Sequence, residues 1–188
     1  MMNPMSNLHF RGMSLFIRVR NAFSPPEKML KEAGIQPGHT VLDYGCGPGG
    51  HSIAAAKLVG QSGEVYALDI HPLAIRSVQK KASRKGLKNI KTIQSDCATG
   101  LQDNSLDIVL LYDTFHELND QQGILAELAR VLKSEGVLSS SDHHLKEQEI
   151  TRGITGSGLF SLLGKDEKTY TFKRKKKNHR KSSLNNTG

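Results

Sequence analysis

The sequence predicts an α/β fold: a seven-stranded, mostly parallel sheet, doubly wound with helices on both faces. Short apolar strands alternate with helices through the first 141 residues, a pattern typical of parallel sheets with helical crossovers. Two final strands flank the charged turn GKDEK at residues 164–168, which is too short for a parallel crossover. One strand of this hairpin must therefore run antiparallel to its neighbour.

The elements follow from turn residues and apolar spacing. Pro26 and Pro72 favour helix starts, whereas Gly34 and Gly86 favour helix ends. The predicted helices cover residues 26–34, 50–58, 72–85, 121–132 and 145–152. The predicted strands cover residues 39–44, 64–69, 90–94, 106–112, 137–141, 159–163 and 169–173.

Composition limits the class of protein. A chain of 188 residues with 37% hydrophobic residues fits one folded domain. The longest apolar run, Ile108–Tyr112, is far below the roughly 18 residues of a membrane span, so we expect none. Arginines interrupt the N-terminus, which lacks the apolar core of a secretory signal. Cys46 and Cys97 form no disulfide or zinc framework, and we expect a cytoplasmic protein.

The net charge of +8 is concentrated near the C-terminus. Residues 1–172 are nearly neutral, with 19 Lys and Arg against 18 Asp and Glu. Seven basic residues then fall within nine positions: Lys173, Arg174, Lys175, Lys176, Lys177, Arg180 and Lys181. We expect residues 174–188 to be a disordered basic tail, and contact with RNA or another anion is the alternative.

A glycine-rich stretch, VLDYGCGPGG at residues 41–50, follows the first strand and marks a cofactor site. Gly45, Gly47 and Gly50 have the G-x-G-x-x-G spacing of nucleotide-binding turns. A dinucleotide site also wants an acid about 20 residues further on, and Asp69 lies 19 residues after Gly50. This spacing alone does not decide the ligand. However, Asp43 would repel a pyrophosphate.

The stretch resembles the first motif of class I S-adenosylmethionine-dependent methyltransferases, and the resemblance covers roughly residues 25–172. Asp43, Gly45, Gly47 and Gly49 match that motif. The resemblance implies the strand order 3-2-1-4-5-7-6 with strand 7 antiparallel. It also implies that the glycine turn faces the carboxylate of S-adenosyl-L-methionine, while Asp43 attracts its ammonium group.

Further motifs extend the resemblance to the nucleoside part of the cofactor. EVYALDIHP resembles the second motif, which implies that Asp69 accepts hydrogen bonds from both ribose hydroxyls and that Ile70 lies beside the adenine. QSDCATG resembles the third motif, which implies that Asp96 accepts a hydrogen bond from the adenine amine and that the Cys97 amide contacts the adenine ring. Tyr112, which ends the fourth strand, is a further predicted cofactor contact.

Three features favour a methyltransferase over a nicotinamide-dependent oxidoreductase: Asp43, the third-strand acid Asp96 and the terminal hairpin. A non-catalytic cofactor-binding module is the remaining alternative.

A methyl acceptor that carries a proton needs a base, and α/β sheets bind ligands at the carboxyl ends of their strands. We predict His116 as this base, because histidine suits proton transfer near neutral pH. A histidine on a helix surface is its alternative role.

Other base candidates are Tyr112 and Asp113 after the fourth strand, and His143 and His144 after the fifth. The run Asp142-His143-His144 could suggest a metal pair. Because neighbouring residues on a strand point to opposite faces, we expect no metal site.

The motifs look most like small type-11 methyltransferases, such as those of quinone biosynthesis, and imply a small-molecule acceptor. No Asn/Asp-Pro-Pro-Tyr/Phe motif of nucleic-acid amine methylation follows the fourth strand. We expect the methyltransferase domain at residues 25–173 and a flap or docking segment at 1–24, with Met13–Phe23 as its amphipathic part. An enzyme that methylates RNA or protein through the basic tail is the alternative.

Overall fold

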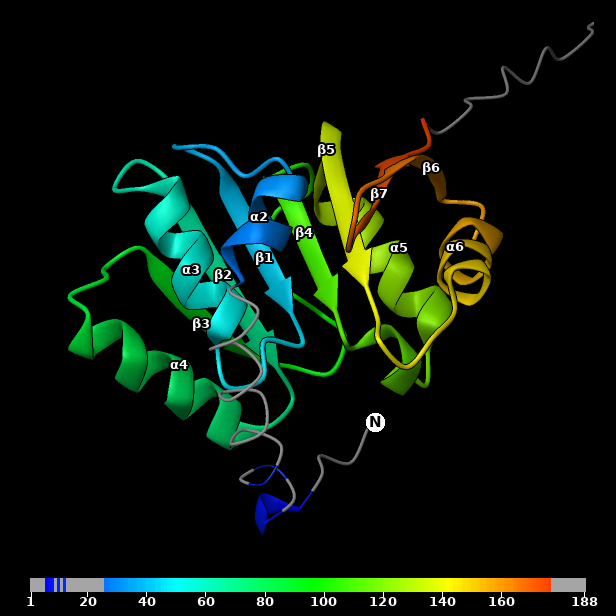
Figure 1. The fold of residues 1–188 in the computed structure, drawn as a ribbon. Coiled ribbons are helices and arrows are strands. Elements are labelled where there is room, and N and C mark those ends of the chain that lie inside the picture. The colour runs from blue at the N-terminus through cyan, green and yellow to red at the C-terminus, as the bar shows by residue number, and fades with distance from the viewer. Residues whose placement is uncertain (1–5, 9, 11, 13–25, 177–188) are drawn as a thin grey trace, which may run out of the picture.

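The computed structural model describes residues 6–8, 10, 12 and 26–176, which build one seven-stranded sheet (Figure 1). The strand order is β3-β2-β1-β4-β5-β7-β6, and β7 runs antiparallel to both β5 and β6. This order confirms the predicted fold. The strands are β1 (Thr40–Tyr44), β2 (Glu64–Asp69), β3 (Ile90–Gln94), β4 (Leu106–Tyr112), β5 (Leu132–Ser141), β6 (Phe160–Lys165) and β7 (Tyr170–Arg174).

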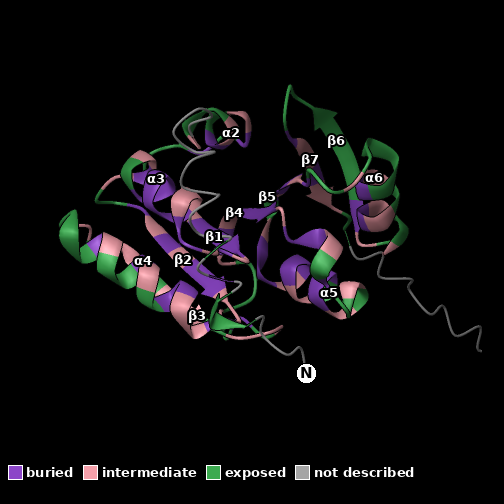
Figure 2. Ribbon diagram, turned by 60° about the horizontal axis from the view of Figure 1, so that its bottom comes forward, coloured by how far each residue is buried: buried purple, intermediate pink, exposed green. Residues whose placement is uncertain are grey.

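Helices cover both faces of the sheet, so its central strands are buried on both sides (Figure 2). One apolar cluster joins α2 and α3 to the sheet, and another joins α5 and α6 to the opposite face. The helices are α2 (Glu27–Glu32), α3 (Gly50–Val59), α4 (Pro72–Arg84), the 3₁₀ helix η1 (Phe115–Glu117), α5 (Gln121–Val131) and α6 (Glu147–Gly156). None of the described helices is long and apolar enough to cross a membrane.

The fifth strand begins earlier than predicted, at Leu132 instead of residue 137. Leu132 pairs with Leu106, but the next pair is Val137 with Ile108, so residues 133–136 form a bulge inside the strand. A Cβ on Gly136 would lie 2.9 Å from the Leu106 carbonyl oxygen. The residues just before the predicted strand therefore form a bulge, in which glycine allows close approach of the neighbouring strand.

The helix after β5 is longer than predicted and runs to Gly156. Ile150 and Ile154 are buried on one face and hold the helix against the core. A Cβ on Gly153 would lie 2.5 Å from the Phe115 ring, so this glycine allows close packing inside the helix. The last strand, β7, also extends one residue past the predicted domain boundary, to Arg174.

Candidate functional site

The glycine turn after β1 needs its glycines for two reasons. Gly45, Gly47 and Gly49 all have positive φ angles, which other residues rarely adopt. A Cβ on Gly45 would lie 2.3 Å from Thr114 Oγ1, whereas a Cβ on Gly47 would meet nothing within 4 Å. The turn leads directly into α3, whose positive dipole end favours an anion such as a carboxylate.

Asp43 lies beneath this turn and is only 2% exposed. Ser52 Oγ donates a hydrogen bond of 2.5 Å to Asp43 Oδ2. Burial raises the pKa of Asp43 above its ordinary value, although nearby His51 and the Ser52 hydrogen bonds oppose the shift. A cation beside this carboxylate would offset the cost of its burial, so Asp43 fits the ammonium group of an amino-acid moiety.

We expect Asp43→Asn to stabilise the cofactor-free protein while weakening its binding of S-adenosylhomocysteine. A raised folded-state pKa stabilises the fold below the unfolded-state pKa, and that contribution is lost as pH rises through the folded-state value. At neutral pH the uncharged Asn side chain avoids the cost of burying a charged carboxylate. Each 1 kcal/mol gained in unfolding free energy raises Tm by about 2–4 °C. Thermal unfolding and calorimetry measure the two effects.

The control is Asp166→Asn in the hairpin turn between β6 and β7, which should leave both quantities unchanged. Affinity for S-adenosylhomocysteine that stays at the wild-type value in Asp43→Asn would contradict the role of Asp43.

Asp69, at the end of β2, is tied to the same turn. Its Oδ2 accepts a hydrogen bond from Gly47 N and its Oδ1 accepts one from His71 N, both at 2.8 Å. Burial raises the pKa of Asp69, and these two N–H groups oppose the shift. Each carboxylate oxygen has a second lone pair, so Asp69 can still accept the two hydroxyls of a ribose. Ile70 follows it, half-buried.

The segment after β3 is tied to the end of β1. Tyr44 donates its hydroxyl to the Asp96 carbonyl oxygen at 3.0 Å, and Cys97 N donates to Ser95 Oγ at 3.3 Å. Asp96 and Cys97 are half-buried at the carboxyl edge of the sheet. Burial raises the pKa of the Cys97 thiol, and more strongly that of Cys46. Neither cysteine is therefore an activated nucleophile at neutral pH.

Tyr112 does not present its hydroxyl to this edge. The hydroxyl lies 2.8 Å from Ser139 Oγ and donates to the Met29 carbonyl oxygen at 3.4 Å. The side chain is buried under α2 and packs edge-on to His51, and burial raises its pKa well above the ordinary tyrosine value. The hydroxyl is thus part of the core, and the structure does not support it as a base.

One residue of the N-terminal segment packs beside the turn. Phe10 is buried, and its ring lies stacked on His71, with 4.5 Å between the ring centroids. It belongs to one apolar cluster with Cys46 and Val78. The predicted amphipathic part, residues 13–23, lies outside the described residues. The sequence reasoning missed Phe10, which is a single aromatic residue with no surrounding pattern.

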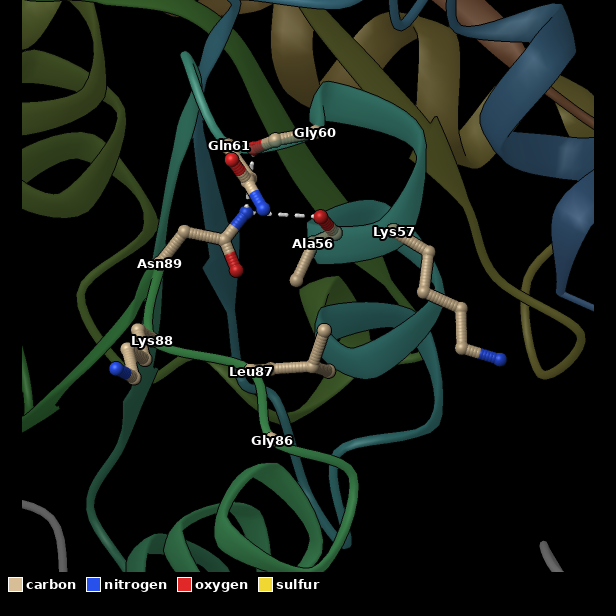
Figure 3. Close-up of a pocket in the computed structure, with 8 residues that line it drawn as sticks. All are labelled: Ala56, Lys57, Gly60, Gln61, Gly86, Leu87, Lys88 and Asn89. Carbon is tan, nitrogen blue, oxygen red and sulfur yellow. Dashed lines mark hydrogen bonds between the residues drawn. The ribbon is translucent and has the colours of Figure 1, made fainter.

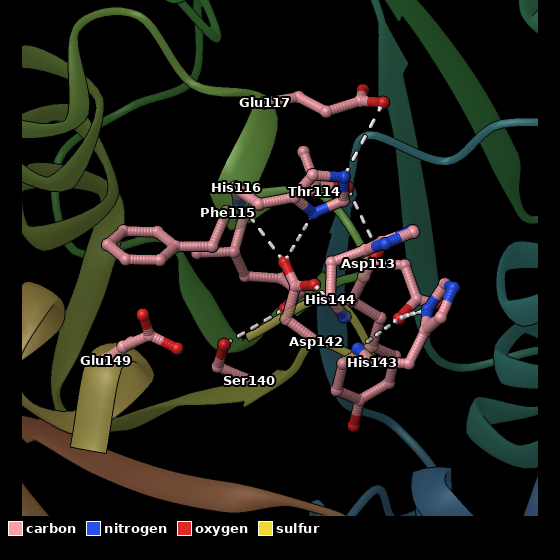
Figure 4. Close-up of polar contacts among 12 residues, drawn as sticks. Asp113, Thr114, Phe115, His116, Glu117, Ser140, Asp142, His143, His144 and Glu149 are labelled. Atoms are coloured by element: carbon pink, nitrogen blue, oxygen red, sulfur yellow. Dashed lines mark hydrogen bonds and ion pairs between the residues drawn. The ribbon is translucent and has the colours of Figure 1, made fainter. Parts of the chain in front are cut away.

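The segments after β4 and β5 are joined by two crossed Asp–His pairs (Figure 4). His116 Nδ1 lies 2.8 Å from Asp142 Oδ2, and His116 N also donates to that oxygen at 3.1 Å. In the other direction, His143 Nδ1 lies 2.7 Å from Asp113 Oδ1. The predicted base candidates of the two strands therefore meet, and Asp142 is a partner that the prediction did not assign to His116.

The prediction that Asp142, His143 and His144 alternate between the faces of a strand was wrong. Residues 142–144 follow β5 in a turn, so they do not alternate between the faces of a strand. The ring centroids of His143 and His144 lie 3.9 Å apart, and those of His116 and His144 lie 4.3 Å apart. Even so, among the described residues no group of three or more His, Cys, Asp or Glu side chains could hold a metal ion.

A separate cavity of about 580 Å³ lies at the amino ends of the strands, away from the glycine turn, between the end of α3 and the start of β3 (Figure 3). There Asn89 Nδ2 donates to the carbonyl oxygens of Ala56 and Gly60, at 2.8 Å each, and so caps the end of α3. None of the predicted site residues lines this cavity. Its polar contacts serve the fold.

A glycine turn with acids at the ends of three neighbouring strands defines an α/β protein that binds a nucleoside cofactor. The chain belongs to the methyltransferase family: residues 35–187 match the family model described as "Methyltransferase domain". The methyl donor of this class is S-adenosylmethionine, and the residues around Asp43 and Asp69 fit it.

Similar proteins carry methyltransferase names. Demethylmenaquinone methyltransferase of Geobacillus kaustophilus is 31% identical over 130 residues, which cover 69% of this chain and 56% of the relative. Aklanonic acid methyltransferase DauC of Streptomyces sp. is 38% identical over 100 residues, which cover 53% of this chain and 46% of the relative. The chain thus spans about half the length of these curated relatives.

A solved structure of similar length has the same fold. The crystal structure of a SAM-dependent methyltransferase from Aquifex aeolicus superposes with a TM-score of 0.78 and is 29% identical. The match covers 90% of this chain and 96% of the Aquifex chain. The described domain is therefore similar in extent to a solved methyltransferase.

Proposed function

We propose that the protein transfers a methyl group from S-adenosylmethionine to a small molecule whose accepting atom carries a proton, as in the C–H or O–H group of a quinol or polyphenol. The observation that carries this is the His116–Asp142 pair, at the sheet edge where the glycine turn lies. A base is useful only for an acceptor that must lose a proton. Names of similar proteins, including demethylmenaquinone and aklanonic acid methyltransferases, support an acceptor of this class.

Each residue of the edge has a separate task in this proposal. Asp43 and the glycine turn hold the amino-acid part of the cofactor. Asp69 holds the ribose, while Ile70 and the segment at Asp96 and Cys97 surround the adenine. The cofactor supplies an electrophilic methyl group, and His116 takes the acceptor's proton. Positioning and exclusion of water supply much of the rate in such in-line transfers.

Two measurements test the proposal. We expect calorimetry to show micromolar binding of S-adenosylhomocysteine and no detectable binding of NAD. We also expect S-adenosylmethionine labelled in its methyl group to label a small-molecule extract, and not matched RNA or protein fractions. Tight NAD binding would refute the cofactor assignment, and label found only in RNA or protein would refute the acceptor class.

RNA or protein methylation through the basic tail remains the second candidate. Arg174 belongs to β7 and donates to the Ala129 carbonyl oxygen at 2.8 Å, and Lys175 N donates to the Leu159 carbonyl oxygen at 2.8 Å. A deletion that tests the tail must therefore begin after Lys176, and not at the predicted boundary.

We expect deletion of residues 177–188 to leave Tm and S-adenosylhomocysteine affinity nearly unchanged, because that segment offers few apolar residues for packing. If the tail binds RNA, its deletion should weaken RNA binding and reduce the salt dependence of that binding. Binding titrations at two salt concentrations measure this term. Equal RNA affinity with and without the tail would reject the second candidate.

We place the reaction in the cytoplasm. Cys46 and Cys97 are both free thiols, which suits a reducing compartment. Fractionation of cells that express the full chain tests this placement.

A further inference from the structure

Asp142 is a buried carboxylate that holds three donors from the segments after β4 and β5. Its Oδ2 accepts His116 N at 3.1 Å and lies 2.8 Å from His116 Nδ1, while its Oδ1 accepts His144 N at 3.0 Å. We propose that Asp142 is a positioning residue that holds His116 with its proton on Nδ1, so that Nε2 is the proton acceptor in methyl transfer. This inference rests on the proposed function.

The tautomer follows from the chemistry of the pair. An ionised carboxylate only accepts hydrogen bonds, so the nitrogen that faces it must be the protonated one. The Asp142 side chain is 0% exposed, whereas that of His116 is 23% exposed. A buried partner that also binds the His116 main chain holds both the ring orientation and the tautomer. Glu117 Oε1 lies 3.8 Å from Nε2, which is too far for a hydrogen bond, so Nε2 keeps the free electron pair.

Two carboxylates and a second imidazole lie around the His116 ring. Among the described residues, the titratable groups that face His116 are Asp142, the ring of His144 at 4.3 Å, and Glu117, whose Oε1 lies 3.8 Å from Nε2. When the acceptor's C–H or O–H bond breaks, Nε2 receives the proton and the electron pair forms the new bond to the methyl carbon. The bond between the methyl carbon and the sulfur breaks, and its electron pair stays on the sulfur. One positive charge thus disappears from sulfur and one appears on a ring flanked by two carboxylates.

Contacts along the chain place this ring near the cofactor turn. Thr114, two residues before His116, touches Gly45 so closely that a Cβ there would lie 2.3 Å from its Oγ1. Asp113, one residue earlier, has a φ of 50°, which turns the chain sharply as it leaves β4. The segment that carries His116 therefore adjoins the glycine turn directly.

The second pair, Asp113–His143, has the same pattern, because His143 N also donates to Asp113 Oδ1 at 3.2 Å, but it is more exposed. The His143 side chain is 51% exposed and the Asp113 side chain 26%, compared with 23% and 0% in the first pair. Both pairs have the same Asp–His chemistry, so the second serves as the rival for the role of base. An aspartate-to-asparagine change in each pair separates them.

The first test needs neither cofactor nor acceptor. Nitrogen NMR of the cofactor-free protein with labelled histidine, assigned with His116→Gln, should show His116 protonated on Nδ1 when neutral. In Asp142→Asn the amide NH₂ group can face Nδ1, and we expect the proton to shift toward Nε2. Wild-type His116 protonated on Nε2, or an unchanged tautomer in a folded Asp142→Asn protein, would overturn the proposal.

The second test measures kcat, KM and their pH dependence for Asp142→Asn, with Asp166→Asn as the matched control. We expect kcat to fall about 10²–10⁴-fold, because the wrong tautomer blocks the base, with little change in S-adenosylhomocysteine affinity. The acid-side decline of the pH–rate profile should also change. A larger loss in Asp113→Asn than in Asp142→Asn would assign the base to His143 instead. Failure of the wild-type protein to methylate any acceptor would reject the proposed function, while the NMR result still decides the tautomer.

Discussion

His116→Ala is expected to lower kcat about 10²–10⁴-fold, the range for removal of a general base, while affinity for S-adenosylhomocysteine stays at the wild-type value. The ring is partly exposed at the edge where β4 ends, and its Nδ1 is held by Asp142. None of the residues assigned to the cofactor contacts the His116 ring through a described hydrogen bond. Chemistry should therefore be lost without loss of cofactor binding. Steady-state kinetics and calorimetry measure the two.

His39→Ala provides the matched control. His39 lies just before β1, at the amino edge of the sheet and away from the site, so its removal should leave kcat unchanged. Added imidazole should restore part of the activity of His116→Ala, because it can occupy the space left by the ring. Wild-type turnover in His116→Ala would show that the acceptor, for example a deprotonated thiol, needs no base there.

Asp69→Ala is expected to weaken S-adenosylhomocysteine binding by roughly 1.5–3 kcal/mol, or about 10- to 150-fold. The loss has two sources. The ribose hydroxyls lose a charged acceptor, and Gly47 N and His71 N lose the oxygens that hold the turn at 2.8 Å. Calorimetry measures the affinity. The Tm of the cofactor-free protein measures how far the change destabilises the turn itself.

Asp103→Ala is the control for this change, because it removes an exposed carboxylate near the amino end of β4. It should leave the affinity unchanged. If Asp69→Ala keeps wild-type affinity, then Asp69 does not bind the ribose, and its place in the site must be reassigned.

Much of the fold was predictable because local signals agreed with one another. The strand order and the antiparallel β7 were implied by the family resemblance and by a turn too short for a crossover. The predictions that were wrong involve long-range packing. The start of β5 and the end of α6 were predicted wrongly, and in these segments Gly136 and Gly153 each allow a close approach to a distant residue, the Leu106 carbonyl oxygen and the Phe115 ring. No local pattern reports such contacts.

The sequence by itself determined which residues we propose for binding the cofactor. The acids and glycines among them lie at fixed offsets from strand ends, and strand ends can be located from apolar patterning. Only the tertiary structure decided the partner of His116, the proposed base. His116 and Asp142 are 26 residues apart, and they meet because β4 and β5 are parallel neighbours whose carboxyl ends lie together. Likewise, Tyr112 looked available at a strand end, but the packing of α2 over β4 and β5 buries its hydroxyl against Ser139.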